Sequence, residues 1–142
     1  MIEHYLKSSI KNIEDLIFLT KEDIEDIKQA NNDAIYKRTK IKDEIIGIFE
    51  TQKSLLDNEL VKLMKKNENK ELSELLSSSE QESLKMLKVK LQELHKINKE
   101  YARLVVAVNE FYTTLFDKIF PTEMEDYKKT NPKSFSLLKV SA

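Results

Sequence analysis

The stretch EQESLKMLKVKLQELHKINKEYARLVVAVNEFYTTLFDKI, residues 80–119, decides the fold. Its apolar residues recur at alternating steps of three and four, which is the spacing of one continuous face along a helix and is typical of a coiled-coil seam. The seam consists of Leu84, Leu87, Leu91, Leu94, Asn98, Tyr101, Val105, Val108, Tyr112, Leu115 and Ile119. Asn98 is its one polar member, and Pro121 ends the helix because the residue before a proline disfavours helical geometry. We therefore predict one long helix over residues 80–119.

A second long helix is predicted ahead of this stretch, from about residue 21 to residue 66, because apolar residues again follow a helical period. Asn67 suits the end of that helix, since asparagine tolerates the geometry of a helix terminus. A short amphipathic piece over residues 70–76 follows. Ser79 with Glu82 then forms the pattern of a capping box, which predicts the start of the next long helix.

These two long helices are expected to pack as an antiparallel hairpin, because their similar lengths and the compact connection place them side by side. The connection implies a register in which Asn98 lies near Ile48 and Gln52. We therefore expect a buried hydrogen bond between Asn98 and Gln52.

The N-terminal segment Ile2–Leu19 adds a further amphipathic helix, with Ile2, Leu6, Ile10, Ile13 and Ile17 on one face. The pattern leaves open whether this helix ends near residue 20 or bends and continues into the next one. The predicted fold is all-α: a long, coiled-coil-like antiparallel helical hairpin with an additional N-terminal helix, three to four helices in total. Residues 1–120 form a single domain, and residues 121–142 form a C-terminal tail.

Composition excludes several classes of protein. One glycine and two prolines in 142 residues are too few for the turns of a sheet fold, a phosphate-binding loop or a dinucleotide fingerprint. The absence of cysteine excludes disulfides and thiolate chemistry. A net charge of −1 gives no electrostatic footprint for nucleic acid. The N-terminus lacks a secretory signal and the longest apolar stretch carries charges, so we expect a cytoplasmic protein without membrane insertion.

No arrangement of residues points to catalysis, to a metal or to a cofactor. The two histidines, His4 and His95, are not in a metal-ligand spacing, and we expect His95 to be an exposed polar residue. A phosphotransfer role for His95 would need space for a phosphate that no nearby glycine provides. The acidic cluster lies opposite the apolar stripe and is expected to be a solvated face; it consists of Glu22, Asp23, Glu25 and Asp26. We therefore expect no enzyme.

The apolar surface of residues 102–120 is too wide for one partner helix. Beside the seam, apolar and small polar side chains form further stripes, so that well over half of the helix circumference is apolar. The candidate client-binding residues are Ala102, Val106, Phe111, Thr113, Phe116 and Phe120. Two interpretations stay open: the N-terminal helix Ile2–Leu19 packs on this surface, or the surface is a groove for an amphipathic helix of another protein.

Two stretches of the chain resemble FlgN-type flagellar export chaperones, which are small helical proteins of the bacterial cytoplasm. They are DIEDIKQANNDAIYKRTKIKDEIIGIFETQKSLLDNELVKLM, residues 23–64, and ELHKINKEYARLVVAVNEFYTTLFDKIFP, residues 93–121. The resemblance covers roughly two-thirds of the chain and is carried by helical pattern more than by diagnostic motifs.

The resemblance implies that the protein binds hook–filament junction proteins of the FlgK and FlgL type and delivers their terminal helical segments to the flagellar type III export apparatus. It also implies that the C-terminal part of the chain holds the client, which points to Val106, Phe111, Phe116 and Phe120. The alternative is a structural coiled-coil scaffold or adaptor that homo-oligomerises through the same apolar surface. The sequence leaves a homodimer open.

Overall fold

The computed structural model describes residues 1–119, and within that part every regular element is a helix. The helices are α1 (Ile2–Lys28), α2 (Asn32–Lys66), α3 (Leu72–Leu75) and α4 (Ser78–Ile119). The all-α fold, with a long antiparallel pair and an additional N-terminal helix, is confirmed. Phe120 and the predicted tail over residues 121–142 lie outside the described residues.

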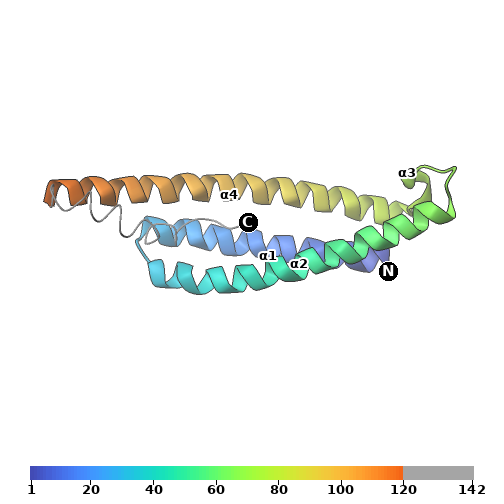
Figure 1. The fold of residues 1–142 in the computed structure, drawn as a ribbon, viewed down its shortest axis with the longest axis horizontal. Helices are drawn as coiled ribbons and strands as arrows, with labels where there is room; N and C mark the ends of the chain where they lie inside the picture. The colour runs from blue at the N-terminus through green and yellow to red at the C-terminus, as the bar shows by residue number, and fades with distance from the viewer. Residues whose placement is uncertain (120–142) are drawn as a thin grey trace.

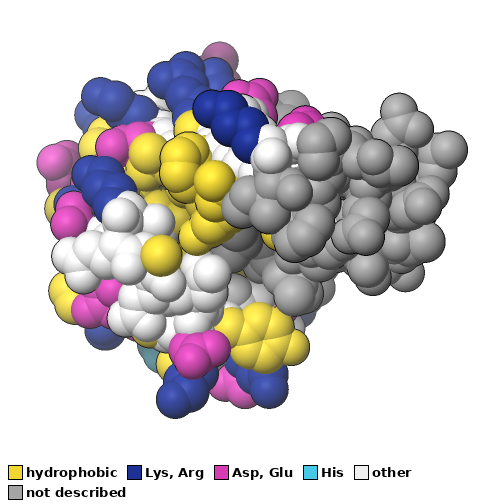
Figure 2. Space-filling view, turned by 90° about the vertical axis from the view of Figure 1, so that its left-hand side faces the viewer, with side chains coloured by type: hydrophobic (Ala, Val, Ile, Leu, Met, Phe, Trp, Pro, Cys, Tyr) yellow, Lys and Arg dark blue, Asp and Glu magenta, His cyan; other side chains and the backbone are white. Residues whose placement is uncertain are grey.

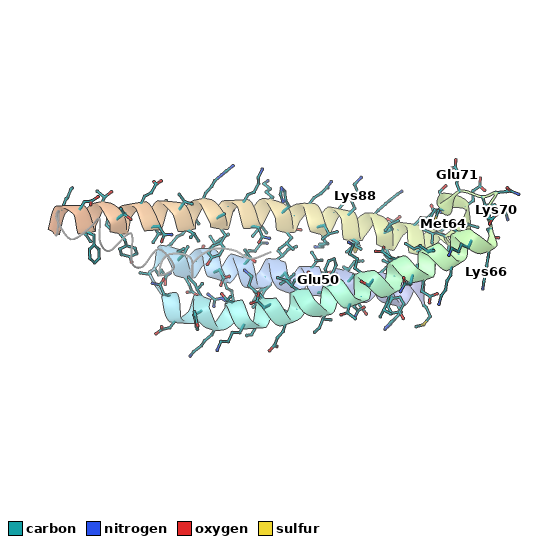
Figure 3. The ribbon with its side chains drawn as sticks, in the orientation of Figure 1. Glu50, Met64, Lys66, Lys70, Glu71 and Lys88 are labelled. Carbon is teal, nitrogen blue, oxygen red and sulfur yellow. The ribbon has the colours of Figure 1, made fainter. Side chains whose placement is uncertain are left out.

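The three long helices lie side by side, with α2 and α4 antiparallel and α1 parallel to α4 (Figure 1). α1 packs along both of the others, whereas the backbones of α2 and α4 stay apart over most of their length. Charged side chains, including Lys66, Lys70 and Glu71, surround the connection through α3 at one end of the molecule (Figure 3). The opposite end carries the α1–α2 turn and the end of α4.

α1 is longer than the sequence predicts, and the second helix starts later. Ile24 and Ile27 continue the buried face of α1 to Lys28, so the predicted start of the second helix near residue 21 is wrong. The chain reverses at Gln29–Asn31, where Ala30 takes the left-handed conformation with φ 59°. The Asn31 N–H donates a hydrogen bond of 2.8 Å to the carbonyl of Asp26 and closes the turn.

The hydrophobic core is centred on α1. Its fully buried members from α1 are Leu6, Ile10, Ile13, Leu16, Ile17, Ile24 and Ile27, joined by Leu87, Leu94, Ile97, Tyr101 and Val105 from α4 and by Ile35 and Leu56 from α2. α4 therefore turns most of its seam toward α1 rather than toward α2. Gln52 Oε1 is buried and accepts no hydrogen bond from residues 1–119, so the Asn98 amide does not donate to it. A third helix between the two predicted partners is the reason.

The N-terminus of α4 is fixed by a capping box that lies two residues earlier than the sequence predicts. The Glu80 N–H donates to Ser77 Oγ at 3.1 Å, and the Ser77 N–H donates to the Glu80 carboxylate at 2.8 Å. Both residues thereby satisfy backbone donors that a helix start leaves without partners. The predicted pair Ser79 and Glu82 is displaced because the helix already begins at Ser78.

Candidate client-binding surface

α4 extends beyond the end of the other helices, past the α1–α2 turn (Figure 1). α1 begins beside the start of α4, where Ser79 Oγ hydrogen-bonds the Glu3 carboxylate, and the Lys21 ammonium lies 3.9 Å from the Glu93 carboxylate. α1 therefore ends before α4 does, and the last part of α4 has no α1 beside it. Among residues 78–118 the buried side chains end at Val105.

Large apolar side chains remain exposed on this free part of α4. Phe111 is 65% exposed and Leu115 is 41% exposed, and they lie four residues apart on one side of α4; we call these two residues the α4 end surface. Val106 is 54% exposed but lies on the opposite side of the helix. Figure 2 views the molecule from that end and shows hydrophobic side chains gathered among charged ones. A shallow hollow of about 470 Å³ beside Val106 is lined by Asn109, Glu110, Thr113 and Thr114 as well.

The predicted binding residues fall into three groups in the structure. Ala102, Val106 and Phe111 are exposed, whereas Thr113 and Phe116 are half-buried. Phe120 lies outside the described residues.

Leu115 is the residue that the sequence analysis misses, because its position in the seam predicts burial against a neighbouring helix. Leu115 is exposed because α4 extends past the ends of α1 and α2 that lie beside it. The signal that could have found it is the turn at Gln29–Asn31, which fixes where α1 ends and α2 begins.

The N-terminal helix does not cover the α4 end surface. Ile2–Leu19 runs beside the first half of α4, as the Glu3–Ser79 hydrogen bond and the ion pair of Lys21 with Glu93 show. The interpretation that this segment packs on residues 102–120 is therefore wrong. The apolar face of this segment is instead buried in the core, farther from the end of α4.

A buried ion cluster holds the three long helices together just before α4 becomes free. Arg38 Nε donates to Asp23 Oδ1 at 2.6 Å, and Lys42 Nζ donates to Asp23 Oδ2 at 2.9 Å. Arg38 also hydrogen-bonds Asp26 and lies 3.5 Å from a Glu22 carboxylate oxygen. The Lys42 ammonium lies 5.4 Å from the centre of the Tyr101 ring, in cation–π contact.

The expectation that the acidic residues form a solvated face is wrong for Asp23, whose side chain is 2% exposed. Glu25 is exposed, as expected, and Asp26 is half-buried. The burial of Asp23 could not be predicted from the sequence, because its partners Arg38 and Lys42 belong to another helix and only the fold brings them to it.

The ion cluster shifts the pKa values of Tyr101 and Arg38. Burial raises the pKa of Tyr101 well above its ordinary value, and the Asp23 carboxylate raises it further. Burial alone would lower the pKa of Arg38, but its hydrogen bonds to Asp23 and Asp26 raise it. Both residues therefore keep their protonated form over the physiological range.

The histidines and the acidic residues that the sequence singles out were considered for phosphotransfer and metal binding. His95 is exposed on α4, as predicted. Residues 1–119 contain no group of three or more His, Cys, Asp or Glu side chains that could hold a metal ion. Asp23 and Asp26 are instead paired with Arg38.

No helix among residues 1–119 is both long enough and apolar enough to cross a membrane. Comparison with protein-family models, with curated proteins and with solved structures gives no match for this chain.

Proposed function

We propose that this protein is a helical binding protein, not an enzyme, and that the α4 end surface holds an amphipathic helix of a client protein. The observation that carries the proposal is the exposure of Phe111 and Leu115, one turn apart on the same side of α4, where the rest of residues 1–118 leaves them uncovered. Clustered exposed apolar side chains on a soluble helical scaffold are the usual mark of a protein–protein contact.

The client class comes from the resemblance to FlgN-type chaperones. On that basis the protein is a cytoplasmic export chaperone that binds terminal helical segments of hook–filament junction proteins of the FlgK and FlgL type. It delivers them to the flagellar type III export apparatus. The buried ion cluster supports this role mechanically, because it fixes the three helices where α4 becomes free and so presents a rigid helix to the client.

The proposal is tested by removing the apolar side chains at the end of α4. We expect Phe111→Ser with Leu115→Ser to weaken binding of a purified FlgK-type terminal segment at least about a hundredfold. The reason is that each buried apolar side chain contributes roughly 1.5–3 kcal/mol. Calorimetric titration of the segment into the parent and the variant measures the loss. Both side chains are exposed, so the melting temperature should stay close to that of the parent.

Val89→Ser is the matched control, because Val89 is 58% exposed on α4 but far from its end. This variant should bind the segment as the parent does. Equal affinity of parent and double variant would refute the α4 end surface as the binding site, and a stable oligomer that covers it would favour the scaffold alternative.

A further inference from the structure

α2 carries an exposed apolar stripe that neither the fold nor the proposed client site uses. Ile41, Ile48 and Leu55 are between 41% and 51% exposed and follow one another at seven-residue steps. Residues seven apart lie on nearly the same side of a helix, and this spacing is the repeat of a coiled coil. Ile45 and Gln52 lie beside the stripe and are half-buried. α2 therefore presents two apolar faces, one to α1 and one to the outside.

The outer stripe is complementary to itself when a second α2 runs antiparallel across a two-fold axis at Ile48. In that arrangement the residues that face each other have numbers that add to twice that of Ile48. Ile48 faces Ile48 of the second copy. Ile41 of each copy faces Leu55 of the other, so this pair occurs twice in the dimer. A two-fold interface brings the same surface of both copies together in this way.

The charges beside the stripe fit the same arrangement. Lys37 on one copy faces Glu59 on the other, and Glu44 faces Gln52, whose amide can donate to a carboxylate. Neither of these two pairs brings like charges together across the axis. Lys37 is exposed, and Glu59 has only a surface ion pair with Lys62 at 3.8 Å to exchange for the new one.

We propose that the outer stripe of α2, formed by Ile41, Ile48 and Leu55, is the interface of an antiparallel homodimer of this protein. The occupant is a second copy because both the apolar and the charged positions are self-complementary about one residue. One pair of helices is a small interface, so the dimer dissociates on dilution.

The dimer leaves the proposed client site free. The end of α4 lies at the N-terminal end of α2 (Figure 1), and antiparallel α2 helices place those ends at opposite extremes of the dimer. The proposal is therefore independent of client binding, and each can fail without the other.

Engineered disulfides test the geometry cleanly, because the chain has no cysteine of its own. We expect Ile48→Cys to form a covalent dimer on mild oxidation, since the two copies of residue 48 meet at the axis. Ile41→Cys should not, because its two copies lie roughly 21 Å apart along the helices, far beyond the reach of a disulfide. Ile41→Cys combined with Leu55→Cys should restore the covalent dimer. Electrophoresis without reductant gives the readout.

Val61→Cys, exposed on α2 but off the stripe, sets the background of random collisions. Cross-linking of Ile48→Cys at that background overturns the interface. Equal cross-linking at positions 41, 48 and 55 overturns the antiparallel arrangement in favour of a parallel one.

A charge exchange gives an independent test in solution. We expect Lys37→Glu to weaken the dimer about tenfold in sedimentation equilibrium, because two ion pairs become two repulsions. Adding Glu59→Lys should restore the parent's association. Lys53→Glu is the control, since it changes the net charge equally on an exposed site away from the stripe. A chain that stays monomeric at all concentrations, or a double variant that is not rescued, refutes the proposal.

Discussion

Asp23 is the residue on which the most interactions converge. Its two carboxylate oxygens each accept a hydrogen bond from a different cation of α2, Arg38 and Lys42, and Lys42 in turn contacts the Tyr101 ring of α4. A buried ion pair adds modest net stability, but removing one member is costly because it leaves charge buried without compensation. One carboxylate thus connects all three long helices.

Asp23→Asn should lower the free energy of unfolding by about 3 kcal/mol, because it keeps the volume of the side chain but leaves Lys42 without its anion. Urea unfolding measures the change. Glu25→Gln, two residues along on the exposed side of α1, is the control and should cost less than about 0.5 kcal/mol. A similar small loss for both variants would show that the buried cluster carries no special weight.

The raised pKa of Tyr101 predicts a loss of stability at alkaline pH. An unfolded tyrosine ionises near pH 10, whereas the folded protein holds Tyr101 neutral because of burial and the Asp23 carboxylate. Below about pH 10 this effect leaves the free energy of unfolding unchanged. Above it, the free energy of unfolding falls by up to about 1.4 kcal/mol for each pH unit. Tyr101→Phe should reduce that slope in unfolding curves measured above about pH 10, and Tyr36→Phe, on the exposed surface of α2, should not.

Helix boundaries show how far sequence reasoning reaches at the scale of elements. The 3-4 spacing predicts α4 well over the described residues, where it is one continuous helix from Ser78 to Ile119. The α1–α2 turn is missed because the apolar period runs unbroken from Leu19 through Ile24 and Ile27. The only local signals are Asn31 and Asn32, which suit a cap but do not demand one. The site inherits this error, since the turn decides that Leu115 is exposed.

Ala30→Gly should leave stability unchanged or raise it by up to about 1 kcal/mol. Alanine at φ 59° pays a steric cost that glycine does not, while the greater freedom of glycine in the unfolded chain opposes the gain. Ala107→Gly, in the exposed interior of α4, should instead lower the free energy of unfolding by about 1 kcal/mol. Thermal unfolding compares the two variants, and an equal loss of stability in both would refute the left-handed turn at Ala30.

At the scale of the whole molecule, α1 is the element that makes the fold. It contacts both long neighbours, whose backbones barely approach each other, and it supplies half of the core cluster. The sequence pattern predicts instead a hairpin of the two longer helices, with the N-terminal helix as an addition to it. Periodicity reveals that a face is apolar but carries no information about which neighbour covers it, so the central role of α1 could not be predicted.

Deletion of residues 1–28 should therefore abolish cooperative thermal unfolding, although α2 and α4 retain part of their helical signal. Circular dichroism during heating distinguishes a sharp transition from a gradual loss. A synthetic peptide of residues 1–28 added in excess should restore the sharp transition, because the core contacts of α1 do not require a covalent link to α2. A sharp transition in the truncated chain alone would mean that the hairpin is stable by itself.

The parallel pairing of α1 with α4 also sets an order of events during synthesis. α1 can meet α2 as the residues after the turn at Gln29–Asn31 leave the ribosome, but Glu3 contacts Ser79, which follows it by 76 residues. The core-facing side of α1 therefore stays open to water while most of the chain is still being translated. The nascent protein therefore spends that interval as an incomplete helical hairpin with exposed isoleucines, and the arrival of α4 completes its core.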